Sequence, residues 1–197
     1  DEDLSQIRFD EIRGKHLVVE EKCDGANTGI SFGAGGELLL QSRGHYLTGG
    51  YREREFNLMK QWAAVHRDAF YRVLGSRYIM YGEWMYAKHS IYYDALPHYF
   101  LEFDVLDRQP GKFLDTPSRQ KLLTGVPVVS VPVLARGRFT DKEELLKLLG
   151  PSRFSTSGHM EGLYLKVEEN GQVVLRLKYV RVSFAQDADV SGTHWLD

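Results

Sequence analysis

The segment Glu21-Lys22-Cys23-Asp24-Gly25-Ala26-Asn27 concentrates side chains that could do chemistry. Lys22 lies between an apolar run, Leu17 to Val19, and a glycine turn, so a rigid strand would hold its amine at the edge of a cleft. Partial desolvation there favours the neutral, nucleophilic amine. Gly25 would let a ligand approach the backbone, and Asn27 can donate and accept hydrogen bonds at a sugar hydroxyl. A surface lysine before a polar turn is the alternative interpretation, because Lys-x-Asp-Gly is short enough to arise by chance.

This segment resembles the first signature of the covalent nucleotidyltransferases, the superfamily of ATP-dependent polynucleotide ligases and mRNA-capping guanylyltransferases. Segments similar to the later signatures follow in the same order. They are Ser42-Arg43-Gly44, Tyr81-Gly82-Glu83-Trp84, Phe100-Leu101-Glu102-Phe103-Asp104-Val105, Glu161-Gly162-Leu163-Tyr164-Leu165-Lys166 and Leu175-Arg176-Leu177-Lys178. The asparagine at position 27 resembles the first signature of the RNA ligases of the type-2 phage and RNA-editing kind. DNA ligases and capping enzymes usually carry arginine at that place.

Two positions depart from the pattern of these RNA ligases. Asp24 stands where that branch often has histidine, and Arg176 stands where the final signature usually has lysine. Arginine keeps the positive charge and can hold a phosphate through two hydrogen bonds. We therefore expect the function to survive the exchange at Arg176.

The resemblance implies a reaction in three steps, each an in-line phosphoryl transfer. The amine of Lys22 attacks the α-phosphate of ATP, expels pyrophosphate and forms a lysyl-AMP phosphoramidate. AMP then passes to the 5′-phosphate of an RNA, and an RNA 3′-hydroxyl displaces it to join the ends. ATP and a divalent cation, Mg²⁺ or Mn²⁺, are the implied cofactors.

The resemblance also implies a role for each signature residue. Lys22, Lys166 and Lys178 are the expected catalytic residues, and Glu161 and Asp24 are the expected metal ligands. The expected nucleotide-binding residues are Glu21, Lys22, Asn27, Arg43, Glu83, Phe103, Lys166, Arg176 and Lys178. Within this set, Glu83 would accept from the ribose hydroxyls, and the Phe103 ring would stack on adenine.

Some of these residues have a structural interpretation as well. Phe103 alternates with Leu101 and Val105, so burial in a core is as well supported as base stacking. Arg176 and Lys178 would share one face of a strand, which could be a solvated face or the phosphate-binding face. Arg52 could lie on an RNA track near Arg43, and Tyr92-Tyr93 could stack on unpaired bases or pack as aromatics.

The elements that must position these residues are mostly strands. Runs rich in Val, Leu, Tyr and Phe predict strands, including one from Val128 to Arg136, and Asn170-Gly171 predicts a tight hairpin. Apolar positions at spacings of three and four predict a helix from Glu53 to Leu74. A capping-box pattern at Thr140 predicts a second helix through Leu149, and a third is expected from Pro117 to Leu123. The fold class is therefore α+β. The resemblance implies the nucleotidyltransferase (ATP-grasp-like ligase) fold of bent antiparallel sheets flanked by helices, as a single adenylyltransferase domain over residues 1–197.

Composition narrows the classes of function. The 197 residues include 25 basic and 27 acidic ones and a single cysteine, which excludes a polycation, a disulfide scaffold and a cysteine-rich zinc module. No signal peptide, membrane span or membrane partner is expected, and the composition favours the cytoplasm. RNA ends are the implied partners, with end-healing domains or another partner outside this sequence left open. The alternatives are a DNA ligase, a GTP-dependent capping enzyme, or a nucleic-acid-binding module without catalysis.

Overall fold

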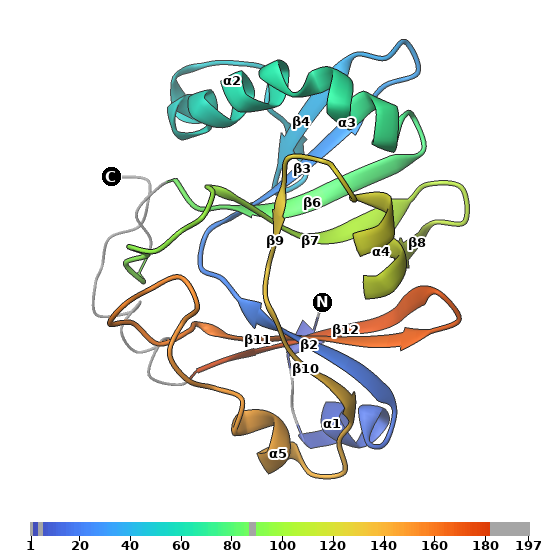
Figure 1. Ribbon diagram of the computed structural model, residues 1–197, viewed down its shortest axis with the longest axis vertical. Coiled ribbons are helices and arrows are strands. Elements are labelled where there is room, and N and C mark those ends of the chain that lie inside the picture. Colours follow the sequence, from blue (N-terminus) through green and yellow to red (C-terminus); the bar gives the residue numbers. More distant parts are fainter. Residues whose placement is uncertain (1, 4–5, 87–89, 182–197) are drawn as a thin grey trace. The chain divides into compact units, whose positions relative to one another are not determined.

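The computed structural model describes residues 2–3, 6–86 and 90–181, and the chain forms two compact units. Unit 1 comprises residues 1–24, 88–97 and 131–197, and unit 2 comprises residues 25–87 and 98–130. Each unit is assembled from separate stretches of the chain. Each is built on a largely antiparallel sheet that has helices packed on one face (Figure 1). The α+β class expected from the sequence is thus confirmed.

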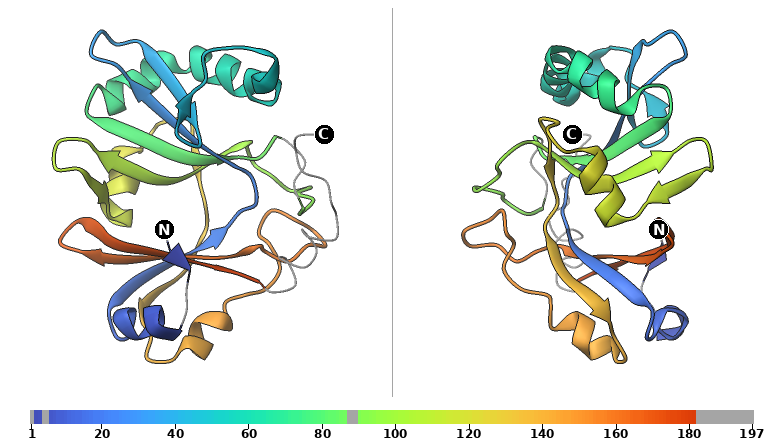
Figure 2. Two further views of the ribbon diagram at one scale, coloured as in Figure 1. Left: turned by 180° about the vertical axis from the view of Figure 1, so that it is seen from behind. Right: turned by 45° about the vertical axis from the view of Figure 1, so that its right-hand side comes forward.

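The sheet of unit 1 has the strand order β10-β2-β11-β12-β1, with only β1 running parallel to its neighbour. Its elements are β1 (Glu2–Asp3), α1 (Gln6–Ile12), β2 (His16–Lys22), β10 (Val133–Arg138), α5 (Lys142–Leu146), β11 (Gly162–Glu169) and β12 (Gln172–Val180). Alternate residues of β2 and β11, such as Val19 and Leu165, point to one face. There they pack against Ile12 of α1 and Leu145 of α5, so both helices cover the same side (Figure 2).

The sheet of unit 2 has the strand order β8-β7-β6-β3-β4-β5, and the short β9 runs parallel to β7. Its elements are β3 (Ala26–Phe32), β4 (Leu38–Ser42), β5 (His45–Tyr46), the 3-10 helix η1 (Tyr51–Phe56), α2 (Asn57–Val65), α3 (Arg67–Leu74), β6 (Tyr78–Trp84), β7 (Phe100–Asp107), β8 (Lys112–Leu114), α4 (Thr116–Leu122) and β9 (Val129–Ser130). Met59 and Phe70 from the helices pack on Ile30 and Met80 from the strands, all of them buried. The opposite face of this sheet carries no part of that core.

The predicted hairpin at Asn170-Gly171 is confirmed. These two residues join β11 to β12, with Glu169 paired to Gln172 across the turn. Both have positive φ, 52° for Asn170 and 79° for Gly171. This is the left-handed pair that a two-residue type I′ turn requires, and Asn and Gly adopt it at least cost.

The predicted helix from Glu53 to Leu74 is divided in the structure. It consists of η1, α2 and α3, and the break between α2 and α3 falls at His66, whose φ of −96° and ψ of 9° leave the helical region. The imidazole of His66 packs beside the rings of Trp62 and Phe70, at centroid distances of 6.0 and 6.1 Å, and these two rings also contact each other at 5.2 Å. The helical spacing still identified the buried face correctly, because Phe56, Met59, Ala63 and Phe70 are all buried.

Two other predicted elements also differ from the structure. The strand expected from Val128 to Arg136 is two strands, because Pro132 has no N–H to donate to a ladder. β9 before it pairs with β7 in unit 2, and β10 after it pairs with β2 in unit 1. The second helix begins one residue later than expected, since Asp141 rather than Thr140 caps it by accepting from the Glu143 N–H at 3.0 Å. That helix ends at Leu146 instead of Leu149.

The third expected helix is confirmed as α4. The Asp115 carboxylate accepts from the Ser118 N–H at 2.9 Å at its beginning, and Pro117 lies in its first turn. None of the helices in the described ranges combines the length and the apolar composition needed to span a bilayer.

Candidate active site

Four of the predicted basic residues share one face of the unit 1 sheet. In the strand register Lys166 of β11 lies opposite Arg176 of β12, and Gly162 lies opposite Lys22 of β2. Lys178 follows Arg176 by two residues and so projects on the same side. This is the face away from α1 and α5, since Leu163, Leu165 and Leu177 on the alternate positions belong to the hydrophobic core. Strand alternation therefore separates the cations from the core.

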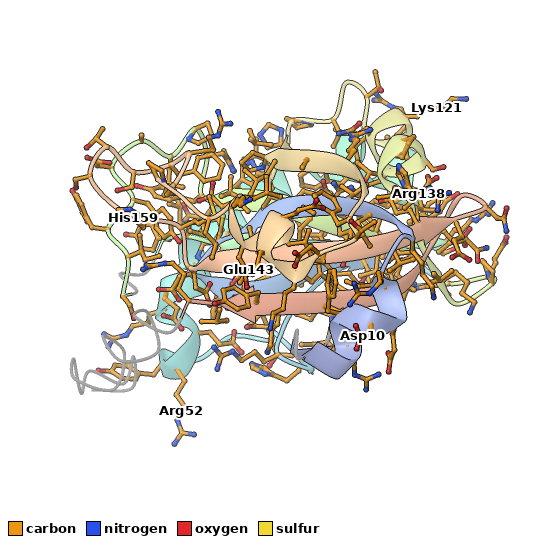
Figure 3. All side chains as sticks on the ribbon, turned by 90° about the horizontal axis from the view of Figure 1, so that it is seen from below. Asp10, Arg52, Lys121, Arg138, Glu143 and His159 are labelled. Atoms are coloured by element: carbon orange, nitrogen blue, oxygen red, sulfur yellow. The ribbon has the colours of Figure 1, made fainter. Side chains whose placement is uncertain are left out.

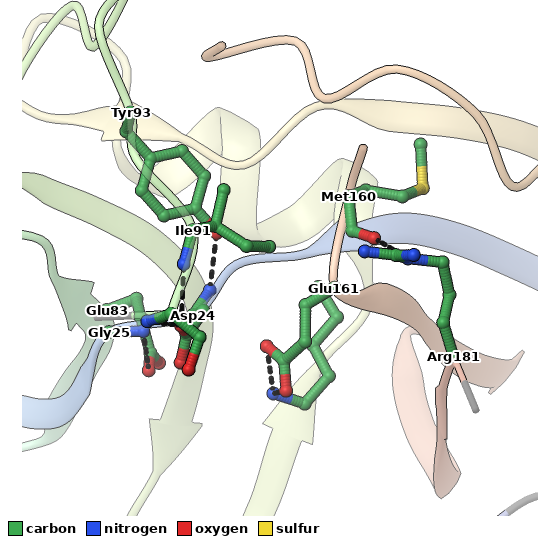
Figure 4. Close-up of polar contacts among 10 residues, drawn as sticks. Asp24, Gly25, Glu83, Ile91, Tyr93, Met160, Glu161 and Arg181 are labelled. Atoms are coloured by element: carbon green, nitrogen blue, oxygen red, sulfur yellow. Dashed lines mark hydrogen bonds and ion pairs between the residues drawn. The ribbon is translucent and has the colours of Figure 1, made fainter. Parts of the chain in front are cut away.

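Lys22 forms an ion pair with Glu161, as the close-up shows (Figure 4). Its Nζ lies 2.7 Å from each carboxylate oxygen, although the two residues are 139 positions apart in the sequence. The Lys22 side chain keeps 24% of its surface exposed, whereas Glu161 keeps 7%. Burial raises the pKa of Glu161, and the nearby positive charges of Lys22 and Lys178 act against that rise. The nucleophile proposed from the sequence is thus reachable from solvent and faces a buried acid.

Lys166 forms a second ion pair, with Glu20, on the same face of the sheet. The distance from Lys166 Nζ to Glu20 Oε2 is 2.8 Å, and both side chains are fully buried. Glu20 is not among the site residues expected from the sequence. The signal was nonetheless present, because Glu20 precedes Lys22 by two residues on one strand and must point to the same side. Arg176 and Lys178 are more accessible, each with a half-buried side chain.

Glu21 lies on the opposite face of β2 from Lys22. Its carboxylate accepts from Ser152 Oγ at 2.5 Å and from the Arg153 N–H at 3.0 Å. Burial raises the pKa of Glu21 and these two hydrogen bonds lower it, with burial the larger effect. A nucleotide bound to the face of Lys22 could therefore meet the backbone of Glu21 but not its carboxylate.

Asp24 binds a neighbouring loop of unit 1. Its Oδ2 accepts from the N–H groups of Ser90, at 2.8 Å, and Ile91, at 3.4 Å, and its own N–H donates to Tyr93 Oη at 2.8 Å (Figure 4). Its other oxygen, Oδ1, accepts no hydrogen bond from the described residues. Among those residues no three His, Cys, Asp or Glu side chains gather closely enough to hold a metal ion. A cation here would depend on one or two carboxylates and on oxygens from a ligand, which is how Mg²⁺ is commonly bound beside phosphates.

Two predicted nucleotide ligands, Asn27 and Glu83, are neighbours in unit 2. They are paired across β3 and β6, on the face away from the helices, because Ile30, Met80 and Trp84 on alternate positions lie in the core. Glu83 Oε1 accepts from the Gly25 N–H at 3.2 Å. Asn27 is exposed and Glu83 is half-buried, so both side chains are open to a ligand on this face.

Phe103 and Arg43 occupy irregular positions of the same unit. A β-bulge in β7, opposite Tyr81 and Gly82, contains Phe103, and the Phe103 carbonyl accepts from Arg119 Nη1. Its ring is half-buried, whereas Leu101 and Val105 are fully buried. The bulge removes Phe103 from the simple alternation that made it resemble a core residue. Arg43 is exposed in the turn between β4 and β5, with a φ of 44°. The Arg52 side chain projects outward from η1 (Figure 3).

Three glycines of the signature segments have neighbours too close for a side chain. A Cβ on Gly162 would lie 1.7 Å from the Tyr179 carbonyl oxygen, and a Cβ on Gly82 would lie 2.4 Å from the Phe100 ring. A Cβ on Gly25 would lie 2.7 Å from both Glu83 Cγ and Met85 Sδ. None of the three has a positive φ, so their backbone conformation does not call for glycine. Glycine is needed at these positions because neighbouring strands and side chains approach so closely.

Comparison with known proteins fits this arrangement of signature residues. The sequence profile described as RNA ligase matches residues 15–180, which is most of the chain. The chain belongs to the RNA ligase family. Comparison with curated proteins gives no match.

Solved structures of an RNA ligase from Naegleria gruberi share the fold. A lysine-to-methionine variant of that ligase with AMP and Mn superposes with a TM-score of 0.72 at 18% identity, over 94% of this chain and 56% of that one. The same ligase with PPi gives 0.69 at 20% identity, over 96% of this chain and 57% of that one. A lysine-to-alanine variant with ATP and Mn gives 0.69 at 19% identity, over 93% and 54%. The chain therefore has the nucleotidyltransferase fold that the sequence implied, and it spans a little over half the length of these ligases.

Proposed function

We propose that this chain is the nucleotide-transfer part of an ATP-dependent RNA ligase, and that it joins RNA 3′-hydroxyl and 5′-phosphate ends through a Lys22-AMP intermediate. The observation that carries the proposal is the ion pair of Lys22 with Glu161, on a sheet face that also presents Lys166, Arg176 and Lys178. The family membership and the Naegleria gruberi ligase structures with ATP, AMP and PPi support it.

The chemistry follows from the charges on this face. In the first step the Lys22 Nζ lone pair forms a bond to the α-phosphorus of ATP while the bond to the bridging oxygen breaks and pyrophosphate leaves. The amine must lose a proton first, and Glu161 is the carboxylate in place to take it, since its oxygens lie 2.7 Å from Nζ. Arg176 and Lys178 are accessible cations that would stabilise the negative charge on the phosphate oxygens.

The other predicted site residues have supporting roles in the proposal. Asn27 and Glu83 would bind the nucleotide sugar, and Phe103 would stack on the base. A Mg²⁺ or Mn²⁺ ion would neutralise part of the triphosphate charge, and Glu161 and Asp24 are the carboxylates of this chain that would hold it. We also propose that residues 1–197 form one adenylyltransferase domain, because neither compact unit is a continuous stretch of sequence. The proposed compartment is the cytoplasm, where ATP and RNA ends are both present.

The experiment that tests the function follows transfer of label from the α-phosphate of ATP to the protein. We expect acid-labile label on the wild type with ATP and Mg²⁺ or Mn²⁺, and none on Lys22→Ala. Lys121→Ala is the matched control, because Lys121 is an exposed lysine on α4 (Figure 3), and it should be labelled like the wild type.

Other outcomes would lead to the alternatives. Label from GTP alone would indicate a capping enzyme, and preference for DNA over RNA ends in a sealing assay would indicate a DNA ligase. A folded protein without AMP already bound that takes no label from either nucleotide would contradict the catalytic proposal and leave a nucleic-acid-binding module.

A further inference from the structure

The backbone just after Lys22 has no partner strand. β2 ends at Lys22 and β3 begins at Ala26, so the N–H groups between them cannot be satisfied by the ladder. The Asp24 N–H donates instead to Tyr93 Oη at 2.8 Å, and the Asp24 carboxylate accepts from Ser90 and Ile91 (Figure 4). The segment 90–93 thus holds both polar ends of Asp24, two residues from the proposed nucleophile.

The continuation of that segment holds the loop that leads to Glu161. The Asp94 carboxylate accepts from the Thr156 N–H at 2.7 Å and from the Thr156 hydroxyl. The Ala95 N–H donates to the Phe154 carbonyl at 3.0 Å. Residues 90–95 therefore connect the backbone beyond Lys22 to the loop before Glu161.

The other side of Lys22 is held by the same loop. Glu21 accepts from Ser152 and from the backbone of Arg153, and the Ser152 hydroxyl also accepts from the Phe154 N–H at 3.1 Å. Hydrogen bonds therefore form a closed circuit through residues 21, 152–156, 90–95 and 24. Lys22 lies between Glu21 and Asp24, the two residues of its strand end that these hydrogen bonds hold.

We propose that Tyr93 is a positioning residue for the first chemical step, and that its hydroxyl fixes the backbone at Asp24 so that Lys22 Nζ is held in place beside Glu161. The inference rests on the proposed function. Tyr93 touches neither Lys22 nor a phosphate in this role, and it acts through the backbone. A displacement of about 1 Å at a nucleophile can cost roughly 100-fold in rate, so a single hydrogen bond on this backbone matters.

The surroundings suit Tyr93 to this role. Burial strongly raises the pKa of its hydroxyl, and the nearby carboxylates of Asp24 and Glu161 add to that effect. Its oxygen lies 2.8 Å from the Asp24 nitrogen and accepts the hydrogen bond of that N–H. Tyr92, the preceding residue, is 71% exposed and provides a natural comparison.

The test compares Tyr93→Phe with the matched control Tyr92→Phe. We expect Tyr93→Phe to form lysyl-AMP roughly 10-fold more slowly at saturating ATP in single turnover, with an unchanged half-saturating ATP concentration. Tyr92→Phe should behave as the wild type. Amide hydrogen exchange at Asp24 should accelerate only in Tyr93→Phe, which reports the lost hydrogen bond without any catalysis.

Three results would overturn the inference. The first is an unchanged rate of lysyl-AMP formation in Tyr93→Phe. The second is an unchanged rate with a higher half-saturating ATP concentration, which would mean that Tyr93 contacts the nucleotide. The third is unchanged amide hydrogen exchange at Asp24. If the wild type forms no lysyl-AMP, the proposed function fails, and the exchange measurement alone decides whether Tyr93 holds Asp24. If Tyr93→Phe does not fold, Thr156→Val takes its place, because it removes only the hydroxyl donor to Asp94 and should slow the same step.

Discussion

Two lysines on one sheet face form ion pairs with carboxylates, and the two pairs differ in how far their side chains are buried. Lys22 with Glu161 retains contact with solvent, whereas Lys166 with Glu20 is buried on both sides. Lys22 can leave Glu161 for a ligand more easily, because its amine already contacts solvent although the Glu161 carboxylate is buried. A buried pair cannot lose one partner without leaving an uncompensated charge in a region of low polarity. Lys22 is thus free to exchange partners, and Lys166 is fixed.

This difference can be measured with two like substitutions. We expect Glu20→Gln to lower the free energy of unfolding by about 3 kcal/mol, because it removes the negative charge that faces the buried Lys166 ammonium. Glu161→Gln should lower it by less than about 1 kcal/mol, since Lys22 can turn toward water. Urea unfolding at neutral pH measures both. Equal losses in the two variants would contradict the assignment of one fixed and one exchangeable pair.

Glu21 leads to a prediction about pH. Its pKa is raised above the ordinary value of 4.5 by burial, so the folded protein binds this proton more tightly than the unfolded chain does. The stability that this group contributes is greatest below pH 4.5 and is lost as the pH rises through the raised pKa. Compared with the wild type, Glu21→Gln should therefore gain stability from acid toward neutral pH, by roughly 1.4 kcal/mol for each unit of the shift. Urea unfolding of both proteins from pH 4 to pH 7 tests it, and a stability difference that does not change with pH would disprove it.

The sequence predicted the shared face of Arg176 and Lys178 but not the carboxylates that pair with Lys22 and Lys166. Lys22, Lys166, Arg176 and Lys178 lie on one face because strand alternation and the signature spacing both specify that face. Tyr93 could not be assigned in this way. Its contact with Asp24 depends on a loop whose course is set by tertiary hydrogen bonds, and no periodic pattern encodes such a course.

At the scale of the elements, the β11–β12 hairpin determines where three of the cations lie. Lys166 is on one strand and Arg176 and Lys178 are on the other, so a slip of register by one residue would turn cations into the core. The type I′ turn at Asn170-Gly171 defines that register at the far end of the hairpin. A local sequence signal therefore sets the position of residues well away from it.

The turn can be weakened without touching the site. We expect Gly171→Ala to lower the free energy of unfolding by about 1 kcal/mol, because its φ of 79° is unfavourable for a residue with a Cβ. Gly150→Ala is the control, since its φ is not positive and nothing lies within 4 Å of an added Cβ. Thermal unfolding of both variants measures the effect. Similar loss in both, or in neither, would show that the turn conformation does not contribute as stated.

The elements that the sequence mispredicted all differ from the structure at a boundary. The helix is divided at His66, the strand is divided at Pro132, and the second helix is capped by Asp141. Periodicity reports the buried face of an element. It does not report where one element ends and the next begins, because ring packing, missing donors and single capping bonds decide that.

For the whole molecule, the two compact units each have their own hydrophobic core and their own polar sheet face. The sequence predicted the α+β class. It did not predict the division into two units, because their stretches interleave along the chain. A ligand that binds the folded protein and not the unfolded chain stabilises the folded state by mass action.

Nucleotide binding should therefore be visible as a thermal shift. In the Lys22→Ala variant, which cannot form the covalent intermediate, ATP with Mg²⁺ at about 100 times its dissociation constant should add roughly 2.7 kcal/mol of stability. For a chain of 197 residues this corresponds to an increase of several degrees in Tm. GTP at the same concentration should give a smaller shift. Equal shifts with both nucleotides would contradict the proposed preference for ATP.

The crowded glycines at positions 25, 82 and 162 have a consequence for the tolerance of the molecule to mutation. Alanine at Gly162 would place a methyl group 1.7 Å from a main-chain oxygen of the neighbouring strand, and no rotamer relieves such a clash. In a library with every single replacement, selected only for folding, position 162 should return glycine alone, because the clash there is with main-chain atoms. Positions 25 and 82 meet mainly side-chain atoms, so they should favour glycine less strictly. Lys22 should accept many amino acids in the same selection and lose that freedom only when ligation is also required.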